Sequence, residues 1–358
     1  MEHGSRLERL RQGLEGRARD HLLVTHPANV AWLTGCHAHG AVVLVGPDRC
    51  RVLLDGRATR AWRDRLAGPF EVAVLGPEGL GDAVARLLGR ARGTLAFEPD
   101  GLDWWQAVAL SRSLPDGWAL DAAGGDVECL RRRKDAGEIR LLSELAREAC
   151  RLRDEAARRL RDGQAEDRVT AAILEGIAAS GSLPAFPPIV ARGLDTLDLH
   201  PAGRRPMRRP PGIALVDLGL ARGGMNSDVA CSVRLPGHGR ANMPLLLEVA
   251  EAAFQAALEA LVPGARAAAV ASAAGQVLRR HGLEVRHDTG HGIGLQVHEA
   301  PWIAEDSPDT IEAGMVVCLE PGAYHPALGG ARREEMVLVT ERGGLVLGSV
   351  AADARPLV

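Results

Sequence analysis

The sequence has no large excess of charge of either sign. Its 43 basic and 46 acidic side chains leave a formal net charge of −3 at pH 7. So small a net charge gives no strong field that would attract a polyanion, which argues against nucleic acid and anionic membranes as main partners. Lysine is almost absent: Lys134 is the only one, and every other basic residue is an arginine. We attribute this bias to a GC-rich genome.

Membrane-length apolar segments and paired cysteines are also missing. The charge-free stretch at residues 267–278 is shorter than the roughly 20 residues that a membrane-spanning helix needs. Residues 1–20 are densely charged and contain no apolar core of a signal peptide, so we expect a cytoplasmic protein. The six cysteines form no Cys-x-x-Cys pair, and we expect buried reduced thiols rather than a disulfide framework.

The composition of the 358 residues is that of a globular chain. Hydrophobic residues make up 46% and charged residues 25%, which is typical of a folded protein rather than a disordered one. In the first 120 residues, short apolar runs alternate with helical stretches, which predicts a small α/β domain. We expect strands at residues 41–45, 51–54, 72–75 and 94–97 and a helix at residues 82–88.

The alternation stops between residues 115 and 134, and we place the domain boundary there. Turn signals at residues 115–117 and 124–125 and a basic run at 131–134 interrupt it. We therefore predict domains at residues 1–128 and 129–358. The second domain has an α+β pattern of amphipathic helices and strands. Helices are expected at about 139–163, 167–179, 245–261 and 266–280, and strands at 213–218, 228–235, 315–319 and 336–340.

Two aspartates flank a glycine-rich turn in the second domain. Asp217 ends an apolar run, and Asp228 follows eleven residues later, after the turn at residues 222–224. The spacing predicts a hairpin on which the two aspartates lie opposite each other, with β-carbons about 5 Å apart. Facing like charges destabilise a strand pair, and a bound cation would reverse that effect. Taken alone, the pair could equally be two solvated carboxylates at strand ends.

A second cluster combines histidine with glycine. His287, His291 and His298 lie within twelve residues, and the glycines between them allow a ligand to approach the backbone closely. Each histidine alone could be an ordinary surface or core residue. The Gly-His-Gly-Ile-Gly segment at 290–294 is not a phosphate loop, because no lysine follows and the spacing differs from the dinucleotide fingerprint. The grouping favours a binding site of another kind.

Two glutamates lie at the ends of apolar runs. Glu320 follows the run at 315–319, and Glu334 precedes the run at 336–339. A carboxylate at the end of a buried strand needs a metal, another partner or contact with solvent. Considered separately, either glutamate could simply reach solvent.

Taken together, these residues form a set of four carboxylates and one imidazole. The set comprises Asp217, Asp228, His291, Glu320 and Glu334. It is rich in hard oxygen donors, unlike a thiolate-based structural zinc site. Four negative charges also balance two divalent cations, and a pair of metal ions is a common hydrolytic arrangement.

The ordered set and its flanking sequence resemble the metallopeptidase family of aminopeptidase P, prolidase, methionine aminopeptidase and creatinase. The matching strings are Val-Asp-Leu-Gly at 216–219, Ser-Asp at 227–228, Gly-His-Gly-Ile-Gly at 290–294, Val-His-Glu-Ala-Pro at 297–301 and Glu-Pro-Gly at 320–322. Pro-Ala-Asn-Val at 27–30 and Trp-Leu-Thr-Gly at 32–35 resemble the start of the creatinase-type N-terminal domain. The resemblance implies an α+β protein, in which a small α/β creatinase-type domain precedes a pita-bread catalytic domain, and it implies a homodimer.

The resemblance also implies roles for single residues. The five residues of the set would hold two divalent metal ions, and Glu320 would also take a proton from the attacking water. His200 matches the family histidine near the scissile carbonyl, and His298 matches the one that stabilises the tetrahedral intermediate. His287 would line the substrate site. Arg332 matches the family arginine before the last glutamate, and we expect it to hold the carboxylate of a C-terminal proline.

Several positions depart from the family pattern. Ala230 and Cys231 stand where peptidases that cleave before proline usually carry Thr-Arg, and Met225 replaces an aromatic residue. The segment from Glu320 to Glu334 is also short. These changes affect the surroundings of the metal ligands and the substrate pocket rather than the ligands themselves.

The branches of this family do not fit the sequence equally well. The creatinase branch is metal-free, and methionine aminopeptidases usually lack the N-terminal domain, so both fit less well. Relatives that only bind macromolecules would have lost ligands, and none is lost here. We predict a prolidase that cleaves Xaa-Pro dipeptides; the alternative is aminopeptidase P, which acts on longer Xaa-Pro peptides. We favour manganese as the metal, although cobalt and zinc also accept this ligand set.

Overall fold

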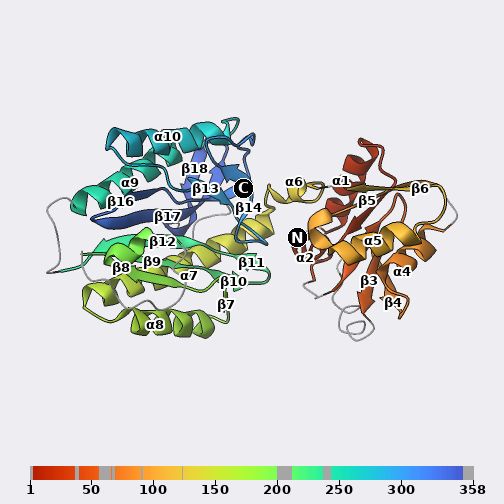
Figure 1. The fold of residues 1–358 in the computed structure, drawn as a ribbon, viewed down its shortest axis with the longest axis horizontal. Coiled ribbons are helices and arrows are strands. Elements are labelled where there is room, and N and C mark those ends of the chain that lie inside the picture. The colour runs from red at the N-terminus through yellow and green to blue at the C-terminus, as the bar shows by residue number, and fades with distance from the viewer. Residues whose placement is uncertain are drawn as a thin grey trace. The chain divides into compact units, whose positions relative to one another are not determined.

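The computed structural model describes residues 3–36, 40–55, 66, 69–89, 92–122, 124–199, 212–236 and 243–349. The chain forms two compact units, Met1–Arg131 and Arg132–Val358 (Figure 1). The boundary predicted between residues 128 and 129 falls inside the short helix α6 (Glu128–Arg131) and stays a prediction. Among the described residues, no helix is both long and apolar enough to cross a bilayer.

The N-terminal unit is built on a mixed six-stranded sheet with the order β4-β3-β2-β1-β5-β6. Its strands are β1 (His21–Val24), β2 (Val42–Val45), β3 (Cys50–Asp55), β4 (Glu71–Leu75), β5 (Gly93–Phe97) and β6 (Trp118–Ala122). Its described residues also form the helices α1 (His3–Glu15), α2 (Pro27–Thr34), α4 (Leu80–Leu88) and α5 (Trp104–Ser113), the short α6, and the 3₁₀ turn η1 (Pro99–Gly101). The predicted strands and helix are confirmed. Strands β1 and β6 were not predicted from the sequence.

The second unit, Arg132–Val358, contains two pairs of long helices on opposite sides of a set of strands. These are α7 (Ala136–Arg161) with α8 (Glu166–Ala179), and α9 (Met243–Ala260) with α10 (Ala267–Arg280). Figure 1 shows α9 and α10 above the strands and α8 below them. One buried apolar cluster joins α7 and α8 to the strands, and a separate one joins α9 and α10 to them. The start of α7 is fixed by a capping box, in which Asp135 and Glu138 each accept a backbone hydrogen bond from the other residue.

The strands of this unit form one large sheet with the order β14-β13-β15-β17-β12-β9-β8. They are β8 (Ile189–Arg192), β9 (Ile213–Leu218), β12 (Val229–Arg234), β13 (Gly290–Gly292), β14 (Glu299–Ile303), β15 (Val316–Leu319) and β17 (Gly329–Thr340). Two short strands, β16 (Gly322–His325) and β18 (Gly343–Val346), also pair with β17. A small sheet joins β7 (Leu183–Pro184), β10 (Leu220–Arg222) and β11 (Met225–Asn226), and two 3₁₀ turns are η2 (Gly193–Leu197) and η3 (Leu347–Ser349).

Two local expectations need correction. Strand β17 begins at Gly329, so Glu334 lies in the middle of a strand rather than before one. The charged residues at 332–335 hide this strand from the apolar pattern, although neighbours on both sides pair with it. The aspartates do not face each other either, because Asp217 is opposite Ala230 and Asp228 lies two residues earlier. The two carboxylates are therefore diagonal neighbours.

Candidate metal centre

Five strands that are neighbours in the large sheet each bring one residue of the predicted ligand set. The strands follow one another as β13, β15, β17, β12 and β9. His291 lies in β13, Glu320 directly follows β15, Glu334 lies in β17, Asp228 directly precedes β12, and Asp217 lies in β9. Residues that are up to 117 positions apart in the sequence are thus brought together by strand pairing alone.

The register explains why three of the carboxylates converge. Ala230 of β12 pairs with Asp217 on one side and with Glu334 on the other. Directly paired residues of antiparallel strands project to the same side of the sheet, and so do residues two apart on one strand. Asp228, two residues before Ala230, therefore points to the side of Asp217 and Glu334. The small Ala230 leaves the space between these carboxylates open.

A second row of paired residues brings the imidazole to the same place. His291 of β13 pairs with Cys318 of β15, and Cys318 pairs with Met336 of β17. Glu334 lies two residues before Met336, and Glu320 lies two residues after Cys318. The ligand atoms of Asp228, His291, Cys318 and Glu334 all lie within 4.8 Å of one another.

The distances between side chains define a compact buried group. The Nε2 atom of His291 is 3.6 Å from Oε1 of Glu320 and 3.8 Å from Oδ2 of Asp228. Arg332 completes the group, because its Nη2 donates to Oδ2 of Asp217 at 2.7 Å and its Nη1 is 3.6 Å from Oε2 of Glu320. The side chains of Asp228 and His291 are only 6% and 3% exposed, so water screens their charges poorly.

The electrostatics of the group are governed by burial and by repulsion between its carboxylates. Burial, and then the neighbouring carboxylates, raise the pKa of Asp228 and the pKa of Glu334 well above the usual values. Burial also raises the pKa of Glu320 to about 7, although the Arg332 guanidinium opposes the shift. Burial and the nearby His298 lower the pKa of His291 to about 4, so its imidazole is neutral at pH 7 and available as a ligand.

The donor set fits divalent metal ions. Within the described residues, Oδ1 of Asp228 and Nε2 of His291 are buried and have no hydrogen-bond partner. A buried polar atom without a partner is costly, and a bound cation would satisfy both atoms. Carboxylate oxygens and a neutral imidazole are the ligands that manganese, cobalt and zinc accept. The residues present therefore support divalent metal binding.

The two remaining histidines of the cluster lie beside this group. The His298 side chain is exposed, and its ring lies edge-on to the His291 ring with centroids 4.3 Å apart. His287 is half-buried, and its Nε2 is 2.9 Å from the hydroxyl of Tyr324, the only tyrosine in the chain. The Tyr324 ring packs directly against the backbone of Gly322 and Gly330. A Cβ atom at either glycine would lie about 2.5 Å or less from the ring, so only glycine leaves room for it. His200 lies outside the described residues.

Two features of the site escaped the sequence analysis. Cys318 is one of four cysteines that are buried, as expected, but its thiol lies among the proposed ligands, whereas Cys129 is exposed. Its position two residues before Glu320 was the available signal. Lys134, the only lysine, forms a buried ion pair with Glu299, which directly follows His298. That Lys134 is the one lysine in an arginine-rich chain was the sequence feature that could have pointed to a special role.

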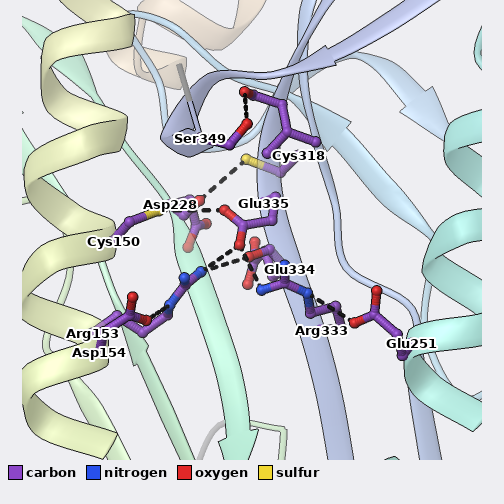
Figure 2. A network of polar contacts seen from close by, with 11 residues as sticks. Cys150, Arg153, Asp154, Asp228, Glu251, Cys318, Arg333, Glu334, Glu335 and Ser349 are labelled. Carbon is purple, nitrogen blue, oxygen red and sulfur yellow. Dashed lines mark hydrogen bonds and ion pairs between the residues drawn. The ribbon is translucent and has the colours of Figure 1, made fainter. Parts of the chain in front are cut away.

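Two guanidinium groups, that of the buried Arg153 and that of the partly exposed Arg333, lie near the position where Cys231 replaces the family arginine. Cys231 pairs with Arg333 across β12 and β17. Arg333 and Arg153 of α7 both donate to Oε1 of Glu335, at 2.5 Å and 2.7 Å (Figure 2). Glu335 directly follows Glu334, so this network holds β17 against α7 next to the ligand group.

The comparisons with known proteins agree with this fold and site, which are those of a metallopeptidase. Residues 140–341 match metallopeptidase family M24, and residues 6–132 match the creatinase/prolidase N-terminal domain. The chain belongs to metallopeptidase family M24. The predicted family and the α+β fold class, with a creatinase-type domain followed by a pita-bread domain, are confirmed.

Similar proteins match either nearly the whole chain or about half of it. The Bacillus subtilis (strain 168) protein named uncharacterized peptidase YqhT is 26% identical over 94% of this chain and 96% of its own. The Xaa-Pro dipeptidase of Pyrococcus furiosus is 30% identical over 56% of this chain and 59% of its own length. Among solved structures, the Xaa-Pro dipeptidase from Bacillus anthracis has a TM-score of 0.88 and 25% identity, with 97% of this chain and 98% of that chain covered.

Proposed function

We propose that this protein is a prolidase, which hydrolyses the Xaa-Pro bond of dipeptides with two divalent metal ions. The observation that carries the proposal is the convergence of four carboxylates and one imidazole from five adjacent strands. We assign the metals to Asp217, Asp228, His291, Glu320 and Glu334. Manganese as the native metal, the homodimer and the cytoplasmic location stay predictions.

The substrate class rests on the relatives and on the chemistry of proline. Two of the similar proteins are named Xaa-Pro dipeptidases. A bond before proline lacks the N–H that ordinary peptidases hold, and its ring fixes φ near −65°, so its cleavage needs a dedicated site. The short segment between Glu320 and Glu334 favours a closed pocket and hence a dipeptide. Aminopeptidase P activity on longer peptides is the alternative.

The chain's own residues can supply binding and proton transfer. When bound, the two cations would lower the pKa of an attacking water and polarise the scissile carbonyl. We assign Glu320 to accept the proton of that water, because its carboxylate lies within the ligand group, 3.6 Å from Nε2 of His291. His298 is exposed beside His291, so it can contact the substrate without being a ligand itself. The role proposed for His200, near the scissile carbonyl, stays a prediction.

The contacts of Arg332 support a role other than the predicted one of holding the substrate carboxylate. Its guanidinium is buried and donates to Asp217, with Glu320 also nearby. These contacts favour a role in orienting two metal-binding carboxylates over a role in binding the substrate carboxylate. His287, which contacts Tyr324, is then the better-placed residue of the two to line the substrate site.

The test offers matched peptides to the enzyme before and after metal exchange. The chain is stripped with a chelator, verified as metal-free and reloaded with manganese, cobalt or zinc. We expect no hydrolysis without metal, recovery with manganese, and faster cleavage of Ala-Pro than of Ala-Pro-Ala. An Ala-Ala dipeptide serves as the control and should be cleaved poorly. Faster cleavage of Ala-Pro-Ala would favour aminopeptidase P, and full activity of the metal-free chain would refute the proposal.

A further inference from the structure

The thiol of Cys318 lies among the residues that we assign to the metals. Cys318 is fully buried in β15 and pairs directly with His291. Its sulfur belongs to the group whose ligand atoms lie within 4.8 Å of one another, together with Asp228, His291 and Glu334. Figure 2 shows the thiol directed at Asp228, whose backbone carbonyl oxygen is 3.8 Å from the sulfur.

The same group contains buried polar atoms that point to a ligand. Among the described residues, Oδ1 of Asp228 and Nε2 of His291 have no hydrogen-bond partner. The side chains that carry them are more than nine-tenths buried. A cation that fills this space therefore meets one nitrogen, carboxylate oxygens and one sulfur atom at the same time.

This combination differs from the ligand set of the proposed function, which contains only oxygen and nitrogen donors. Manganese prefers oxygen ligands, whereas thiolate selects softer ions such as zinc. Zinc binds Cys sulfur, His nitrogen and carboxylate oxygen, usually with four ligands in a tetrahedron. Asp228, His291, Cys318 and Glu334 supply one such set of four.

We propose that Cys318 is a conditional metal ligand, which binds zinc, cadmium or cobalt at this site but leaves manganese to the oxygen and nitrogen ligands. The inference rests on the proposed function, which assigns Asp228, His291 and Glu334 as metal ligands. The role of the Cys318 thiol is added to that assignment. On coordination the S–H bond breaks, the proton leaves to solvent, and a metal–sulfur bond forms with no change of oxidation state. Thiophilic ions are thereby held more tightly and compete with manganese.

Cobalt provides a direct spectroscopic test, because a thiolate ligand adds an intense sulfur-to-cobalt charge-transfer band in the near ultraviolet. Visible d–d bands independently report that cobalt is bound. The full-length metal-free chain is titrated with cobalt as the parent and as Cys318→Ser, which keeps a hydrogen-bond donor but removes the soft atom. Cys129→Ser is the matched control, because Cys129 is the exposed thiol that adventitious metal would reach.

We expect the charge-transfer band in the parent and in Cys129→Ser, and d–d bands without it in Cys318→Ser. We also expect Cys318→Ser to weaken cadmium binding about tenfold or more while changing manganese binding by less than about threefold. A parent without the band, or a band that survives in Cys318→Ser, would overturn the assignment.

A second pair of outcomes separates this inference from the proposed function. Failure of the manganese-loaded parent to cleave Ala-Pro, with the cobalt band present, would refute the prolidase and leave the thiol ligand in place. Cleavage of Ala-Pro by a parent that lacks the band would refute the thiol ligand alone. Cys318→Thr repeats the test if the serine variant folds poorly, since its methyl group fills more of the buried space.

Discussion

The Nζ of Lys134 lies 2.8 Å from Oε1 of Glu299, and their side chains are 2% and 7% exposed. The pair is packed against Gly294, where a Cβ would lie 2.7 Å from Glu299 Oε1 and 3.2 Å from Lys134 Cε. The carbonyl oxygen of Gly294 accepts hydrogen bonds from the backbone and side chain of Asn226. The pair therefore fixes the loop that presents His298, close to the strand that begins after Asp228.

Removal of the lysine should be costly. Lys134→Met leaves Glu299 as a buried charge without its cation, and we expect the free energy of unfolding to fall by about 3–5 kcal/mol in urea denaturation. The double variant Lys134→Met with Glu299→Leu should recover most of this loss, because it removes both charges. A single variant that loses less than about 1 kcal/mol would show that the pair does not fix the loop.

Asp228→Asn should separate metal binding from stability. The amide keeps the shape of the side chain but removes one of several like charges in a buried group, so metal content measured by mass spectrometry should fall. The same change should raise the unfolding free energy of the metal-free chain by about 1 kcal/mol or more. Asp306→Asn, at an exposed aspartate, is the control and should change neither quantity. Two metals retained by Asp228→Asn would contradict the ligand assignment.

The sequence predicted most of the fold where the patterns are regular. The helix expected at residues 167–179 is α8 (Glu166–Ala179), because its apolar residues recur with the helical period. Strand β17 was only half predicted, since charged residues at 332–335 carry the site and break the apolar pattern. The position of Cys318 among the ligands depends on the pairing of β13 with β15, and register between strands distant in the chain is not written in local periodicity.

His298→Ala tests the residue beside the metal group. The His298 ring touches His291 edge-on and its side chain is exposed, so the variant should keep its metal content. We expect turnover of Ala-Pro to fall about 10²–10⁴-fold, the usual effect of losing a positioned proton donor or acceptor. His281→Ala, at an exposed histidine after α10, is the control. If His298→Ala instead lost metal while turnover per bound metal stayed unchanged, the role of His298 would be to hold the ligand His291 in place.

Arg153→Met tests the network around Glu335, next to the ligand group. Arg153 donates to the buried Glu335, and after its loss Arg333 and the Cys150 thiol are the donors to Glu335 that Figure 2 still draws. We expect the unfolding free energy to fall by about 3 kcal/mol. Arg159→Met removes a half-exposed pair with Glu155 and should cost only about 0.3–0.5 kcal/mol. Equal losses for the two variants would show that the buried network adds no stability.

Arg332→Lys decides between the two roles of this arginine. A lysine has one charged atom, so it cannot keep both the 2.7 Å contact with Asp217 and the approach to Glu320 at 3.6 Å. If Arg332 orients these carboxylates, kcat/KM should fall by about 10–100-fold for Ala-Pro and equally for Ala-Pro amide, which has no C-terminal charge. The two substrates are controls for each other on one enzyme preparation. A rise in KM confined to Ala-Pro would return Arg332 to the substrate carboxylate, because only that substrate has a charge to hold.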